Sequence, residues 1–168
     1  MTFTTPSVLS RLDRMLAGCP PTLVDTVTAS RLMFRIVSLL ETHIDEVLKP
    51  FGLTMREYLA LRLISDQPNE PLRPSDLSST LDAPRPQITR LLDELERKGL
   101  AQRVPCRGDR RSLQLIQTPA AQALLEEASP AVHAVYMNAW AIPGPDGTHE
   151  VVQHLISVHA ALCSAQTV

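Results

Sequence analysis

Residues 73–118 read RPSDLSSTLDAPRPQITRLLDELERKGLAQRVPCRGDRRSLQLIQT, and this stretch decides the fold of the chain. Pro74 suits the first turn of a helix, and Asp76 places a carboxylate at the positive end of that helix. A turn follows at residues 81–84. We therefore expect a short helix that leads through this turn into a second helix.

The second helix has two different faces. Its apolar residues repeat at i, i+3, i+4 and i+7, as one buried face of a helix requires. They are Ile88, Leu91, Leu92 and Leu95. Gly99 follows Lys98 as a C-terminal stop. The opposite face begins with side chains that can donate to base edges and phosphates in a major groove. They are Arg85, Gln87, Thr89 and Arg90.

After Gly99 the pattern changes from helical to alternating, which is typical of a β-hairpin. We expect its strands at residues 100–104 and 113–116, with a tip at residues 105–111. The tip combines one carboxylate with three guanidinium groups. These belong to Asp109, Arg107, Arg110 and Arg111. Such a mobile cationic tip suits a narrow, electronegative minor groove, so the whole stretch predicts a winged helix-turn-helix.

The charges of the chain are distributed unevenly. Residues 84–111 hold eight of the 16 Lys and Arg but only four of the 18 Asp and Glu, so this segment carries +4 and the remainder −6. A basic stripe in an acidic chain indicates nucleic-acid binding. The segment has no Phe, Tyr or Trp on which single-stranded bases would stack, which favours double-stranded DNA.

The sequence resembles the MarR family of bacterial transcriptional regulators. The resemblance rests on residues 88–100 and on Asp109-Arg110-Arg111-Ser112 with Leu115 and Thr118, and it extends from about Leu32 to the C-terminus. The long leader, Pro74-Ser75-Asp76-Leu77, Arg103 and the Asp-Arg-Arg run are most similar to the multidrug-efflux repressor branch. Pro84 departs from the family pattern, since many members have a capping serine there.

This resemblance implies a homodimer on a pseudo-palindromic operator, an aspartate that braces the wing arginine (Asp109 with Arg111), and repression relieved by a small ligand. It also completes the set of residues expected to bind DNA. That set is Arg73, Ser75, Arg85, Pro86, Gln87, Thr89, Arg90, Arg107, Asp109, Arg110 and Arg111. Relatives bind small, often aromatic and anionic compounds, for which the expected lining residues are Arg31, Arg35, Tyr58, Tyr136 and Trp140.

The rest of the chain is expected to be helical. We expect a leader over residues 1–23 with a short helix at 8–17 that packs on the partner subunit, and a first dimerisation helix over 24–50. The winged helix-turn-helix domain spans 53–118, and its first helix opens with a capping box from Thr54 to Glu57. C-terminal dimerisation helices span 119–168, with a kink at Pro130 and a loop at residues 143–147.

Composition excludes several classes of protein. The chain has 44% hydrophobic residues but only 4% aromatics and 6 glycines, so it is expected to be mainly α with one small β-hairpin. It shows neither a secretory leader nor an apolar run of the roughly 18 residues that a membrane span needs, and we expect a cytoplasmic location without membrane contact. Three cysteines without a C-x-x-C motif indicate no disulfide framework and no zinc site.

Two other functions are weaker. One is a winged-helix module that binds a protein and no DNA, and the other is a thiol-based redox regulator acting through Cys106 or Cys19. An enzyme is not expected, because no nucleophile has a base and an orienting acid in a recognisable context. We expect no cofactor, and the spacing of His149, His154, His159 and Cys163 does not favour a metal site.

Overall fold

The structure is a computed structural model that describes the backbone of residues 6–65, 72–106 and 109–165. It divides into two compact units, residues 1–42 and residues 43–168. The boundary lies within one helix, so the final turns of that helix belong to the second unit.

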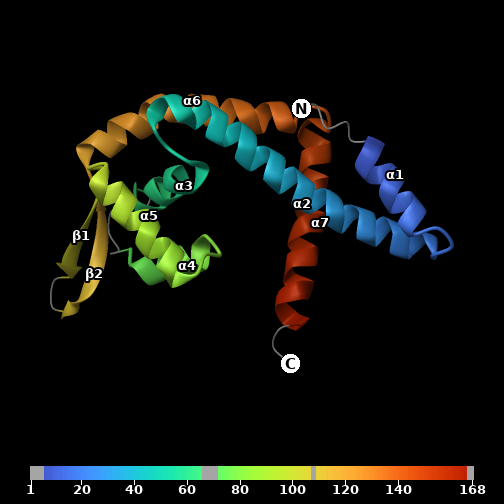
Figure 1. The fold of residues 1–168 in the computed structure, drawn as a ribbon, viewed down its shortest axis with the longest axis horizontal. Helices are drawn as coiled ribbons and strands as arrows, with labels where there is room; N and C mark the ends of the chain where they lie inside the picture. The colour runs from blue at the N-terminus through green and yellow to red at the C-terminus, as the bar shows by residue number, and fades with distance from the viewer. Residues whose placement is uncertain (1–5, 66–71, 107–108, 166–168) are drawn as a thin grey trace. The chain divides into compact units, whose positions relative to one another are not determined.

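The first unit contains α1 (Pro6–Met15) and most of α2 (Pro21–Leu48) (Figure 1). Both helices begin earlier than the sequence predicted. A proline has no N–H to lose in the first turn and its fixed φ is already helical, so Pro21 opens α2 instead of preceding it. Gly18, with a φ of +87°, reverses the chain between the two helices.

The second unit holds the winged helix-turn-helix and the C-terminal helices. Its elements after α2 are a 3₁₀ turn (Lys49–Phe51), α3 (Met55–Ser65), α4 (Pro74–Thr80), α5 (Arg85–Arg97), β1 (Ala101–Cys106), β2 (Asp109–Gln117), α6 (Pro119–Ala139) and α7 (Gly144–Ala165). Figure 1 shows α3, α4 and α5 gathered beside the antiparallel β1–β2 hairpin. The mainly helical fold with one small hairpin is therefore confirmed.

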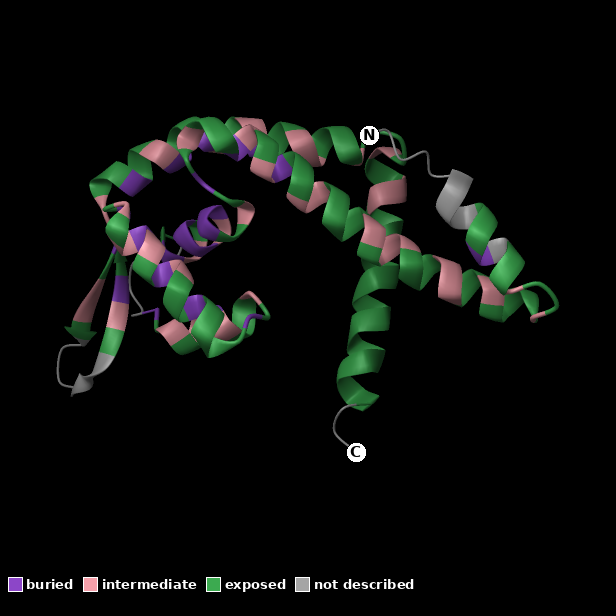
Figure 2. Cartoon of the chain, viewed as in Figure 1, coloured by how far each residue is buried: buried purple, intermediate pink, exposed green. Residues whose placement is uncertain are grey.

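One apolar core joins these elements. It takes side chains from α3, α4, α5 and α6, from β2 and from the end of α2 (Figure 2). Those that are almost completely buried are Ile44, Leu48, Leu61, Leu77, Ile88, Leu92, Leu95 and Val132. The predicted buried face of α5 supplies three of the eight. The core therefore fixes which face of α5 is left to solvent.

The expected capping box opens α3. The backbone N–H of Thr54 donates to Oε2 of Glu57 at 2.8 Å, and the Thr54 hydroxyl accepts from the Glu57 N–H at 3.3 Å. Asp45, near the end of α2, accepts from the Met55 N–H at 2.6 Å. These bonds satisfy donors that a helix N-terminus otherwise leaves without partners.

One expectation about the C-terminal helices needs correction. Helix α7 begins at Gly144, so the loop expected at residues 143–147 is largely helical. Proline in the first turn and Asp146 at the positive helix end explain why these residues start a helix. Helix α6 continues through Pro130, and the kink expected there remains a prediction. No described helix is long and apolar enough to cross a membrane.

Candidate nucleic-acid interface

Hydrogen bonds cap α4 and shape the turn that leads to α5. Asp76 accepts from the Arg73 N–H at 2.8 Å, and the Ser78 hydroxyl donates to the Ala83 carbonyl at 2.6 Å. Asp82 adopts the left-handed region with a φ of +46°, which aspartate tolerates better than most residues. The turn thus brings the chain to Pro84, and α5 follows directly at Arg85.

The first turns of α5 expose every residue expected to read DNA there. These residues are Arg85, Pro86, Gln87, Thr89 and Arg90. Ile88, between them, is 2% exposed and anchors the helix from its other side. The Thr89 hydroxyl donates to the Arg85 carbonyl at 3.0 Å, so its donor is already used within the helix. Arg73 and Ser75, at the start of α4, are exposed as well.

The second half of α5 is electrically different, because its acids are paired. Arg97 donates to Glu94, and this hydrogen bond lowers the pKa of the Glu94 carboxyl and raises that of Arg97. Among the described residues, Arg85 and Arg90 form no ion pair. The positive charge of α5 is therefore concentrated at its N-terminal end, where the helix dipole is also positive.

Lys98 ties the end of α5 to the start of α3. Its Nζ donates to Oε1 of Glu57 at 2.6 Å and to the Gly52 carbonyl at 2.7 Å. Glu57 is only 4% exposed, so this pair neutralises a buried carboxylate. A carboxylate in such a place is costly unless a cation and hydrogen-bond donors surround it.

Arg103 connects the wing to α5, and sequence analysis missed this role. Its Nη1 lies 2.6 Å from Oε2 of Glu96 and 2.7 Å from Oδ1 of Asp93, and its Nη2 donates to the Thr89 carbonyl at 3.1 Å. Its backbone N–H also donates to Glu96 at 2.9 Å. Arg103 pairs across the hairpin with Leu115, which is buried, so both lie on the inner face.

The hairpin strands are longer than expected. Cys106 pairs with Asp109, so only residues 107 and 108 lie between the strands, and the backbone of Arg110 and Arg111 belongs to β2 rather than to a mobile tip. A short connection lets main-chain pairing continue through polar residues, which a hydrophobic pattern does not reveal. Arg107 lies outside the described residues. The side chains of residues 106 and 109–112 do too, including the expected Asp109–Arg111 brace.

The residues expected to bind a ligand lie in different surroundings. Arg31 and Arg35 line a cleft within the first unit. Tyr58 is 4% exposed in the core of the second unit, and its hydroxyl donates to Ser129 at 3.0 Å. Tyr136 packs against the same core, and burial raises the pKa of its phenol. Trp140 is half-buried at the end of α6.

The residues considered for metal and thiol chemistry lie partly outside the described part of the structure. The described part of the chain has no group of three or more His, Cys, Asp or Glu side chains able to hold a metal ion. Cys163 and His159 share one face of α7, with Sγ 3.6 Å from Nε2. Cys19 is half-exposed, and the side chain of Cys106 is outside the description.

Known proteins with similar sequences and folds are regulators. The transcriptional repressor MprA of Escherichia coli K12 is 32% identical over 114 residues, which cover 68% of this chain and 65% of MprA. The match thus spans just under two thirds of this relative's length. CouR from Rhodococcus jostii RHA1, solved with p-coumaroyl-CoA, is 27% identical, with a TM-score of 0.67 over 78% of this chain and 88% of CouR.

A third relative shows the fold at lower identity. MepR of S. aureus, solved in complex with DNA, is 20% identical and superposes with a TM-score of 0.74 over 79% of this chain and 96% of MepR. The sequence profile described as the MarR family matches residues 51–112, which contain α3 to α5 and most of the hairpin. Together with the winged fold and the exposed basic end of α5, these similarities establish that the chain belongs to the MarR family.

Proposed function

We propose that this protein is a transcriptional repressor that binds a pseudo-palindromic duplex operator as a homodimer and is released by a small ligand. The single observation that carries the DNA-binding half is the start of α5, where exposed Arg85, Gln87 and Arg90 surround the N-terminus of a helix anchored by the core. Helix N-termini and guanidinium groups both attract phosphate, and glutamine reads base edges. The relatives MprA, described as a repressor, and MepR, solved with DNA, support the proposal.

A test needs a duplex that the protein itself selects. Repeated selection from random 30-base-pair duplexes, followed by fluorescence anisotropy, gives an operator and its affinity. Arg90→Ala should weaken binding by about tenfold or more, because a charge-assisted contact to DNA is lost. Arg97→Ala removes another exposed arginine, from the paired end of the same helix, and should bind like the wild type. Equal affinities of the wild type and Arg90→Ala would contradict the proposal.

The wing is proposed to enter the minor groove beside each reading helix. Arg111→Ala should weaken operator binding because a guanidinium in the narrow groove is lost, and Asp109→Ala should do the same through loss of its brace. If both variants match the wild type in the same anisotropy assay, the wing makes no energetically important contact.

A homodimer is proposed because α7 exposes apolar side chains to water, which is unfavourable unless a partner covers them. The side chains of residues 149–165 are exposed throughout (Figure 2), and six of them are large and apolar. They are Val151, Val152, Leu155, Ile156, Val158 and Leu162. Contiguous apolar surface of this kind marks an interface, and a two-fold dimer would place two reading helices about 34–36 Å apart on one face of the duplex.

The dimer is tested by charge placed on α7. Ile156→Asp should convert the dimer to monomer or aggregate in analytical ultracentrifugation, because the carboxylate would be buried without a partner. Gln153→Asp adds the same charge to a polar position of α7 and serves as control. A soluble dimer in the Ile156→Asp variant would place the interface elsewhere.

A further inference from the structure

Helix α7 carries a cysteine and a histidine that are placed like two ligands of one metal ion. Sγ of Cys163 lies 3.6 Å from Nε2 of His159 and 4.0 Å from Nδ1 of the same ring. Zinc holds a thiolate sulfur at about 2.3 Å and an imidazole nitrogen at about 2.0–2.1 Å, so two such atoms on a tetrahedral ion are about 3.6 Å apart. The distance between Sγ and Nε2 therefore matches one edge of a zinc tetrahedron.

This pair supplies half of the ligands that a zinc site needs. A structural zinc ion takes four protein ligands, and the described residues contain no group of three or more His, Cys, Asp or Glu side chains that could hold a metal ion. A second copy of the chain, related by a two-fold axis, offers the same two ligands again. The spacing of the histidines argues against a site within one chain, but a site shared by two chains needs only this pair.

The pair also lies in the apolar surface through which α7 is proposed to form the homodimer. At about 100° per residue, one stripe of α7 lies within about 60° of His159 on either side. Between positions 150 and 165, its other members are Val152, Leu155, Ile156, Leu162 and Cys163. An interface that covers this stripe removes the imidazole and the thiol from water, and buried polar groups without partners are costly.

We propose that two copies of this chain bind one Zn²⁺ ion between them through His159 and Cys163 of each copy, and this proposal rests on the homodimer proposed above. Each thiol releases its proton to solvent when it binds the ion. Two thiolates balance the charge of Zn²⁺, so the complete site is neutral and suits an apolar interface. Thiolate and imidazole are ligands of zinc, whereas calcium and magnesium take oxygen ligands.

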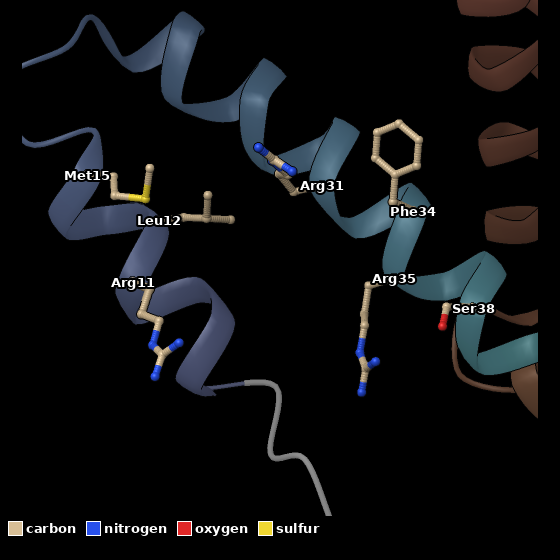
Figure 3. A pocket seen from close by; sticks show the side chains of 7 residues that line it. All are labelled: Arg11, Leu12, Met15, Arg31, Phe34, Arg35 and Ser38. Carbon is tan, nitrogen blue, oxygen red and sulfur yellow. The ribbon is translucent and has the colours of Figure 1, made fainter. Parts of the chain in front are cut away.

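Two clefts of the described chain offer no comparable set of ligands. The cleft between α1 and α2 is lined by three arginines and four uncharged residues, without histidine, cysteine or carboxylate (Figure 3). A second cleft, between the end of α3 and the first half of α6, has one acid, Glu126, together with Arg62 and no histidine or cysteine. Neither cleft therefore competes with α7 for zinc.

The proposal is tested by equilibrium dialysis of the full-length, reduced protein against buffered Zn²⁺, with bound metal measured by mass spectrometry. The wild type should retain one zinc ion per two chains, and Cys163→Ser and His159→Gln should each lose it. The controls are Cys19→Ser and His154→Gln, which changes a histidine on the opposite side of α7 whose Nδ1 lies 2.8 Å from the Glu150 carbonyl. Both controls should retain the ion.

Two further measurements report on the ligands and on the dimer. Co²⁺ in place of Zn²⁺ should give the visible absorption of a tetrahedral ion and a thiolate-to-cobalt band, both absent in Cys163→Ser. Zinc should raise the melting temperature of the wild type and leave that of Cys163→Ser unchanged, because an ion that binds only the folded dimer stabilises it.

Several results would overturn the proposal. They are one zinc ion per chain, retention of zinc by Cys163→Ser, or no zinc binding by the reduced wild type. A disulfide between the Cys163 residues of two chains, formed by a protein that binds no zinc when reduced, would assign the pair to thiol chemistry instead.

The shared zinc site and the proposed homodimer fail in different ways. Metal-free wild type and Cys163→Ser should still sediment as dimers, because the apolar side chains of α7 remain. A dimer that binds no zinc would refute the site and keep the homodimer. A protein that is monomeric with and without zinc would refute the homodimer and the site together, while binding to the selected duplex would be judged by anisotropy alone.

Discussion

Replacing Arg103 with methionine tests whether the wing is held to α5 by this one side chain. Methionine keeps the aliphatic stem and removes the bonds to Asp93, Glu96 and the Thr89 carbonyl. The arginine side chain is 21% exposed, and those of Glu96 and Asp93 are 34% and 58% exposed. Water therefore screens the Arg103–Asp93 pair more than the Arg103–Glu96 pair. A charge-assisted bond contributes about 1.5–3 kcal/mol when protected and about 0–1 kcal/mol at the surface.

The expected loss of stability is therefore about 2 kcal/mol, most of it from Glu96. For a chain of this size that corresponds to a fall in melting temperature of about 4–8 °C. A double-mutant cycle with Glu96→Gln, measured by urea unfolding at one fixed protein concentration, should give a coupling of about 1–2 kcal/mol. In Glu96→Gln the new amide oxygen can still accept from the Arg103 backbone N–H, as the carboxylate does, so this variant should lose less stability than Arg103→Met.

Operator affinity gives a second measurement on the same variants. At a temperature where Arg103→Met is fully folded, it should bind the selected duplex more weakly, because the wing is no longer oriented relative to the reading helix. Arg97→Met, which removes a 70% exposed arginine paired within α5, is the matched control and should leave stability and binding unchanged. A coupling free energy near zero, or equal effects of Arg103→Met and Arg97→Met, would refute the role of Arg103 in holding the wing to α5.

Three further predictions concern single side chains. Gln87→Ala should lower the ratio of operator to scrambled-duplex affinity, whereas a loss equal for both duplexes would assign it to phosphate contact. Lys98→Met should destabilise the fold by about 2–3 kcal/mol by leaving Glu57 buried without its cation, and adding Glu57→Gln should restore part of that loss; no restoration would contradict this account. In Tyr58→Phe, Tyr136 is the one tyrosine that remains, so absorbance at 295 nm follows its ionisation, which should occur above pH 10 because burial raises its pKa. The stability that the neutral phenol contributes below pH 10 should then be lost as pH rises through that pKa. Titration of Tyr136 at the ordinary value would disprove the effect of burial.

Local chemistry made most of the second unit predictable. The capping box at Thr54 and Glu57, the first-turn proline at position 74 and the apolar period of α5 each act within a few residues, so the helices they predict are present. The prediction of a loop at residues 143–147 was wrong because proline and glycine mark both loops and helix starts.

The contacts that matter most for function are long-range, and periodicity does not specify them. Arg103 reads as one more polar residue of an alternating strand until the register pairs it with Leu115 and places it beside Asp93 and Glu96. Lys98 reads as a helix-end cation until the fold brings Glu57, 41 residues earlier, within 2.6 Å. The cleft beside Arg31 likewise depends on which faces of α1 and α2 meet.

The ion pairs at the end of α5 also set how strongly salt should weaken DNA binding. Arg97, Lys98 and Arg103 are neutralised by acids of the protein, so they displace few cations condensed on the duplex. The other five basic residues between positions 84 and 111 are Arg85, Arg90, Arg107, Arg110 and Arg111, and the salt dependence measures how many of them reach phosphate. A dimer that uses all ten should show a slope of about −9 in log affinity against log salt concentration, whereas the full charge count would give about −14. Counterion release thus measures how many of these arginines serve the fold and how many serve the DNA.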